Sequence, residues 1–311
     1  MVKEKYVLVG NGLNICLKDS YSWSNLLEEI AKKYNVDYNS ELSMPFEFER
    51  ILNTYLENSL DEETTKTSVV NRMKNDIASI IIESKLDKSA IHYELRKLNV
   101  DGFITTNYDH NLEKVFDSSY EYDGSEKNKY LFDKTAEIND KKFYHIHGIA
   151  GCNKSICLGY EHYIGIAEKE RSELNTKKDN KPYDMNIKRI LYGQDKQTNH
   201  SFEKFYTADI AIIGLNLDTS EIDIWWLLTH RAYLYNSNYA MLMSKELLNN
   251  NITYYDILCK DDKSNEHKKN IYSLLRSLHV NVRAHEINND NEYKKTYKAI
   301  IREIDKTFRL L

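Results

Sequence analysis

Short apolar runs recur along the chain, and each ends in a glycine or in a cluster of polar residues. Runs of this kind, bounded by turn signals, are typical of buried strands. They predict strands at 5–9, 102–106, 143–147, 209–213, 252–257 and 280–284. Apolar residues at helical spacing between these runs predict helices near 22–34, 264–278 and 291–308. Strands that alternate with helices in this way indicate an α/β fold with a doubly wound, mostly parallel sheet.

Residues 44–98 break this alternation because their pattern is helical throughout, with one apolar set around Ile51 and another around Ile77. The chain is therefore predicted to be one Rossmann-like domain, residues 1–311, with a helical layer inserted at about 44–98 and a C-terminal strand–helix extension at about 250–311. Monomers rarely expose large apolar patches. We therefore expect the second apolar set to cover the ligand site or an oligomer interface.

Composition narrows the choice of partners and compartment. The 311 residues are 41% hydrophobic, enough for one large folded domain. The net charge is −5 and the two signs are interleaved, so nucleic acid is not an expected direct partner. Without an apolar run of about 18 residues or a signal-like N-terminus, we expect a cytoplasmic protein that does not enter a membrane. No disulfide framework is expected from Cys16, Cys152, Cys157 and Cys259.

Polar clusters follow four of the predicted strands, at residues 10–14, 105–109, 145–148 and 214–223. Because ligands bind outside the carboxyl ends of strands in open α/β sheets, their joint placement predicts one site. The glycine turn at 10–14 is either a phosphate turn or a tight connection without a ligand. Asn107 either caps a helix or orients a ligand. His145 and His147 alternate, and His147 beside Gly148 is the better-exposed candidate for acid–base work.

In this order, residues 10–12, 106–109 and 147–148 resemble the signature of the Sir2 superfamily. Segments at 22–27, 158–163 and 221–228 extend the resemblance to bacterial Sir2-like proteins of antiphage defence, over roughly residues 5–260. The resemblance implies that NAD is the substrate and that Asn107 and His147 are catalytic. It implies NAD contacts from Gly10, Asn11, Gly12, Asn14, Thr106, Asp109, Gly214, Asn216 and Asp218.

Two departures from the deacylating sirtuins shape the expected activity. A zinc ribbon needs four cysteines, and Cys152 and Cys157 form one loose pair, so no metal is expected. Residues 217–220 lack the Gly-Thr-Ser pattern and the clamp for an acyl-lysine peptide. The resemblance then implies an NAD glycohydrolase that depletes NAD in antiphage defence by abortive infection, with a linear or cyclic ADP-ribose product. The alternatives are an NAD-dependent protein deacylase and a catalytically silent NAD or ADP-ribose sensor. Control by a regulatory partner protein or by self-assembly is expected.

Overall fold

The computed structural model describes residues 3–15, 21–59, 65–84, 90–125, 128–174, 190–191, 199–236, 248–260 and 265–311. Its strands are β1 (Lys5–Val9), β2 (Gly102–Thr105), β3 (Ala136–Ile138), β4 (Lys141–His145), β5 (Asp209–Ile213), β6 (Ile252–Cys259) and β7 (Val280–Ile287). Its α-helices are α1 (Gly12–Ile15), α2 (Trp23–Lys33), α3 (Met44–Asn58), α4 (Lys66–Glu83), α5 (Ala90–Leu95), α6 (Asn111–Lys114), α7 (Tyr160–Leu174), α9 (Lys204–Thr207), α10 (Ile222–Asn236), α12 (Asn265–Ser277) and α13 (Tyr293–Leu310). None of these helices is long and apolar enough to cross a membrane.

The described strands form one sheet in the order β3-β4-β2-β1-β5-β6-β7. Every neighbouring pair is parallel except β3 and β4. From β1 the chain builds outward through β2 and β4 on one side and through β5, β6 and β7 on the other. This is the Rossmann strand order, and its switch point lies between β1 and β5. The predicted doubly wound, mostly parallel sheet is therefore confirmed.

Both faces of the sheet are covered, because successive residues of each strand point to opposite sides. On one face Tyr6 and Leu8 of β1 join a core that includes residues of α7, α10 and α12. On the other face Val7 and Val9 pack with α5 and α13. The C-terminal segment is thus part of the main fold: β6 and β7 continue the sheet, and α13 covers it.

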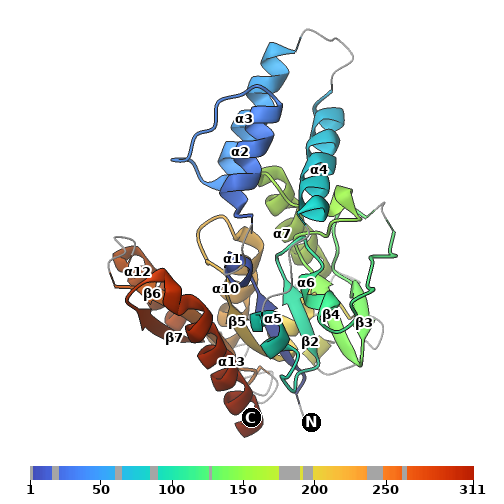
Figure 1. The fold of residues 1–311 in the computed structure, drawn as a ribbon. Coiled ribbons are helices and arrows are strands. Elements are labelled where there is room, and N and C mark those ends of the chain that lie inside the picture. The colour runs from blue at the N-terminus through green and yellow to red at the C-terminus, as the bar shows by residue number, and fades with distance from the viewer. Residues whose placement is uncertain are drawn as a thin grey trace.

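The structure differs from the sequence predictions in two places. No strand is predicted between 102–106 and 143–147, yet β3 lies between them and pairs with β4; its three residues are too few and too exposed to show a pattern. The helical layer also has other members: α2 packs with α3 and α4, whereas α5 joins the core beneath α13. We call α2, α3 and α4 the helical cap. Figure 1 shows it at one end of the molecule, with both termini at the other.

The two apolar sets of the cap pack against each other rather than on separate surfaces. Ile51 of α3 and Ile77 of α4 are both fully buried in one cluster, which also takes in Tyr108 and Ile156 from the body. Within the described residues, the two sets therefore bury each other and do not form two separate apolar faces. The exposed apolar side chains of the cap are Phe46 and Ile82.

At the switch point, glycines allow the loops after β1 and β5 to approach each other closely. Gly10 N–H donates to Ile213 O at 3.0 Å, and Gly12 N–H donates to Gly214 O at 2.7 Å. A Cβ on Gly10 would lie 2.5 Å from both Gly214 O and Leu215 Cα, which are backbone atoms that cannot swing away. The close approach of the two backbones therefore explains the glycines of this turn.

Gly10→Ala is expected to lower the free energy of unfolding by about 2–4 kcal/mol, because β1 and β5 must separate to admit the methyl group. Urea unfolding measures it. The matched control is Gly124→Ala, where the added methyl group meets only the Tyr122 side chain. Equal stability of Gly10→Ala and the wild type would contradict the close approach of the two loops.

Candidate active site

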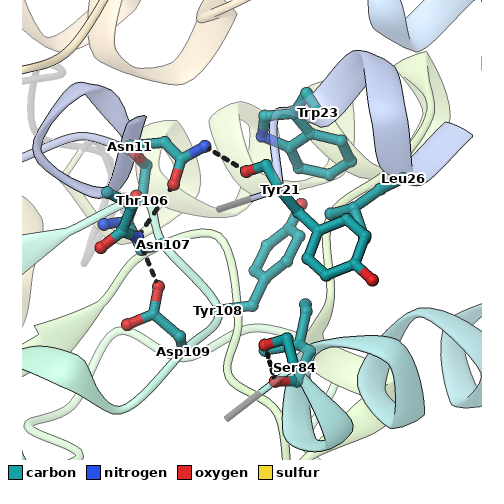
Figure 2. A pocket seen from close by; sticks show the side chains of 11 residues that line it. Asn11, Tyr21, Trp23, Leu26, Ser84, Thr106, Asn107, Tyr108 and Asp109 are labelled. Atoms are coloured by element: carbon teal, nitrogen blue, oxygen red, sulfur yellow. Dashed lines mark hydrogen bonds between the residues drawn. The ribbon is translucent and has the colours of Figure 1, made fainter. Parts of the chain in front are cut away.

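A small cavity lies where the loops after β1 and β2 meet the helical cap (Figure 2). Its volume is about 40 Å³, room for only a few water molecules. A second cavity of about 360 Å³ adjoins it, and Ile81 of α4 and Asp109 line both. The smaller cavity is lined by Asn11, Asn14, Tyr21, Trp23, Leu26, Ile81, Ser84, Thr106, Asn107, Tyr108 and Asp109. Five of the residues predicted from sequence are therefore brought together here: Asn11, Asn14, Thr106, Asn107 and Asp109.

The backbone of Asn107 is hydrogen-bonded on both sides, whereas its side-chain oxygen has no partner among the described residues. Its N–H donates to Thr105 Oγ1 at 3.0 Å, and its carbonyl oxygen accepts from His145 Nδ1 at 2.8 Å. The residue is 8% exposed, yet Oδ1 has no hydrogen-bond partner among the described residues. A buried polar atom without a partner is costly and calls for a ligand or another function.

His145 supports Asn107 from the core. Its Nε2 lies 2.7 Å from Glu113 Oε1, and the ring is fully buried. Because Nδ1 donates to a carbonyl and Nε2 faces a carboxylate, both nitrogens carry protons. Burial disfavours the charged ring, but Glu113 outweighs it and raises the pKa of His145. The ion pair therefore fixes the loop on which Asn107 sits.

An amide network fixes the other polar residues of the smaller cavity. Asn14 Nδ2 donates to Asn11 Oδ1 at 2.9 Å and to Asp109 Oδ2 at 2.8 Å. Asn11 Nδ2 in turn donates to Tyr21 O, and Asp109 Oδ1 accepts from Asn111 N–H at 2.8 Å. Asn14 is 1% exposed. These side chains hold the loops after β1 and β2 together and leave Asn107 free.

His147 occupies a different environment from Asn107 and does not line this cavity. Its Nε2 lies 2.8 Å from Asp223 Oδ2 and 3.7 Å from Glu221 Oε2. His147 is 1% exposed and His145 is 0% exposed, so the two rings do not differ in exposure in the way that the sequence predicted. The start of α10 supplies Asp223, and Tyr163 of α7 packs edge-on at 5.1 Å.

The two carboxylates control the charge of His147. Burial favours the neutral ring, but Asp223 and Glu221 outweigh it and raise the pKa of His147 to about 9. Burial also raises the pKa of Glu221 to about 8. At neutral pH the group therefore holds an imidazolium against the Asp223 carboxylate. Sequence analysis missed the role of Asp223, although it had noted the segment 221–228.

The residues predicted after β5 do not line the cavity of Asn107. The carbonyl oxygen of Gly214 accepts a hydrogen bond from Gly12 N–H in the turn after β1, and Asn216 is exposed. Asp218 accepts hydrogen bonds from the N–H of Ser220 at 2.7 Å and from its hydroxyl, and its carbonyl oxygen accepts from Trp225 Nε1. Asp218 therefore shapes the turn into α10.

One group of side chains in the described residues has metal-ligand geometry. His147, Glu221 and Asp223 each offer one ligand atom within 4.8 Å of the others. Here, however, His147 Nε2 and Asp223 Oδ2 are hydrogen-bonded to each other. A metal ion would have to replace that bond.

Zinc analysis of the purified protein is expected to show well under one zinc per chain. Burial raises the pKa of the Cys157 thiol well above its ordinary value, and Cys152 Sγ donates to Ser125 O at 3.2 Å. Protonated thiols are poor zinc ligands. Elemental analysis after dialysis against zinc measures this, and stoichiometric zinc retained by the wild type but lost in Cys157→Ser would contradict it.

One protein family matches the part of the chain that contains the candidate site. Residues 101–217 match the SIR2-like domain family. This segment runs from β2 through β5 and contains Asn107, His147 and Gly214. A search of the curated proteins finds no match to the chain. Residues 101–217 are therefore similar to the SIR2-like domain family, and the Rossmann-like sheet carries this matched segment.

Proposed function

We propose that this chain is an NAD glycohydrolase, which cleaves the bond between nicotinamide and ribose to give nicotinamide and ADP-ribose. SIR2-like domains use NAD as a substrate. The observation that carries the proposal is the buried Asn107 amide, whose oxygen has no hydrogen-bond donor among the described residues while its backbone is fixed on both sides. A preorganised polar group of this kind suits a reacting ribose or an attacking water.

The reaction needs few groups. As the glycosidic bond breaks, its electron pair goes to the pyridinium nitrogen, and positive charge builds on the ribose. Water then attacks the anomeric carbon and loses a proton. In our proposal the Asn107 side chain orients the ribose or this water.

His147 is proposed to bind a ribose hydroxyl. Asp223 occupies its Nε2, and in our proposal Nδ1 is the ring nitrogen that binds the substrate. An imidazolium paired with Asp223 adds no net charge beside the cationic ribose. In this state His147 donates a hydrogen bond instead of acting as a base.

Access for NAD requires the cap to move. The cavity beside Asn107 is far smaller than a dinucleotide, and Ile81 and Ser84 of the cap close one side of it. In our proposal α4 moves away from Asp109, which joins the cavities of about 40 and 360 Å³. Such a lid excludes water from the ribose until NAD is bound. Gly10, Asn11, Gly12 and Asn14 are then proposed to contact the pyrophosphate, which requires some of their present hydrogen bonds to be exchanged. Gly214, Asn216 and Asp218 are proposed to face the adenosine side.

The biological role that fits this chemistry is NAD depletion in antiphage defence, with turnover held off by a regulatory partner or by self-assembly. An NAD-dependent deacylase and a silent sensor remain the competing functions. Incubation of the purified protein with NAD, with and without an acetylated peptide, separates the three. Peptide-independent release of nicotinamide is the expected result. A strict requirement for the peptide supports a deacylase, and binding without release supports a sensor; either outcome overturns the proposal.

A further inference from the structure

A separate cavity of about 340 Å³ lies between the helical cap and the body. Helices α3 and α4 line one side, and α7 and the 3-10 turn η1 (Asn153–Ser155) contribute to the other. It shares no lining residue with the cavity of Asn107. Its size falls within the range of small-molecule sites. We call it the lysine cavity because Lys66, Lys74, Lys129 and Lys154 line it.

Lysines outnumber carboxylates in this cavity. Four lysines face two glutamates, Glu49 and Glu161. Glu161 is already paired with Lys66 at 2.5 Å. The lining also includes His162, which is uncharged near neutral pH because burial lowers its pKa to about 3. The cavity is therefore electropositive.

Lys74 differs from the other three lysines of the cavity in its burial. It is 3% exposed, whereas Lys66, Lys129 and Lys154 are exposed at the rim. Its ammonium group has three donors, and its one hydrogen bond among the described residues goes to Lys154 O at 2.8 Å. No described carboxylate forms an ion pair with it. Buried charges are normally paired because an unpaired one is costly. Burial accordingly lowers the pKa of Lys74 to about 8, so much of it remains charged at neutral pH.

We propose that the lysine cavity binds a phosphorylated small molecule, with the phosphate on Lys74 and the rest of the ligand against Phe48, Leu52 and Val70. Lysine binds phosphate as a compact charge. The exposed lysines at the rim attract the anion, and Lys74 gains the anionic partner that the described residues do not supply. The three apolar side chains line the same cavity and suit an organic body beside the phosphate.

The test is calorimetric titration of the full chain with sodium pyrophosphate at constant ionic strength, with sodium sulfate as the comparison anion. We expect saturable binding of pyrophosphate that Lys74→Met weakens by about tenfold or more. The methionine is apolar and similar in size, so the variant should unfold at the same or a higher temperature. Lys97→Met, which removes an exposed lysine of another surface, is the matched control and should bind like the wild type.

Asn11→Ala separates this site from the pyrophosphate contacts of the proposed NAD site, and it should bind pyrophosphate unchanged. A second measurement does not depend on variants: pyrophosphate should protect Lys74 from amine-reactive labelling at pH 8, as read by peptide mass spectrometry. Equal affinity of Lys74→Met and wild type, binding no tighter than that of sulfate, or labelling of Lys74 that pyrophosphate does not slow would each overturn the proposal. None of these results bears on NAD cleavage.

Discussion

Asn107→Ala is expected to reduce NAD turnover by about 10²–10³-fold, the usual loss when one preorganised polar group is removed from an active site. The same substitution should leave stability unchanged or slightly higher. The side-chain oxygen makes no hydrogen bond to the described protein, so its removal breaks none and relieves a buried, unsatisfied group. Loss of activity without loss of stability is the signature of a group kept for a ligand.

The measurement pairs nicotinamide release with thermal unfolding. Asn58→Ala is the matched control, because Asn58 is an exposed asparagine at the end of α3. It should alter neither quantity. If Asn107→Ala retains wild-type turnover, the amide has another role and the proposed site is wrong. If it unfolds at a much lower temperature, the side chain has a structural partner that the described residues do not reveal.

Asp223→Asn is expected to reduce turnover by about 10²-fold or more and to move the alkaline limb of the pH profile to lower pH. The carboxylate holds the orientation and charge of His147, and loss of the equivalent partner in a histidine-containing triad costs even more. The pKa of His147 is raised to about 9 chiefly through Asp223, so neutralising that charge lowers it. The alkaline limb therefore moves downward if the imidazolium is the active form.

The control for this variant is Glu170→Gln. Glu170 is buried, and burial raises the pKa of its carboxyl group well above the usual range, which favours the neutral form. Replacement by glutamine keeps its charge and shape, and turnover should stay near that of the wild type. Unchanged turnover and an unchanged pH profile in Asp223→Asn would falsify the role given to the Asp223–His147 pair.

The same pair makes stability depend on pH. The pKa of His147 in the folded protein, about 9, lies above the unfolded value near 6.5. Its contribution to stability is therefore complete below pH 6.5 and is lost as the pH rises through 9. Urea unfolding between these values should show a decline on the order of 1–3 kcal/mol that is smaller in Asp223→Asn. An equal decline in both proteins would assign it to other groups.

Sequence pattern predicted the sheet well because buried strands are short apolar runs with clear ends. It also predicted which loops meet, since the carboxyl ends of parallel strands share one edge. This is why Asn11, Asn14, Thr106, Asn107 and Asp109 were found together. The pattern did not predict how deeply each of these side chains is buried.

The partner of His147 could not be predicted in the same way. Asp223 is 76 residues away from it along the chain, at the start of α10, where an acidic residue is ordinary. The buried Lys74 was missed for a related reason: one lysine on an amphipathic helix predicts an exposed position. Only tertiary packing decides such cases.

The most direct measurement of the central claim is product analysis of NAD incubated with the purified protein in water enriched in ¹⁸O. We predict nicotinamide and ADP-ribose in equal amounts, with the label at the anomeric hydroxyl of the ADP-ribose, and formation of both products slowed about 10²–10³-fold in Asn107→Ala. NAD that stays intact under every condition tested, or nicotinamide released only with transfer of an acyl group from a peptide, would contradict the account.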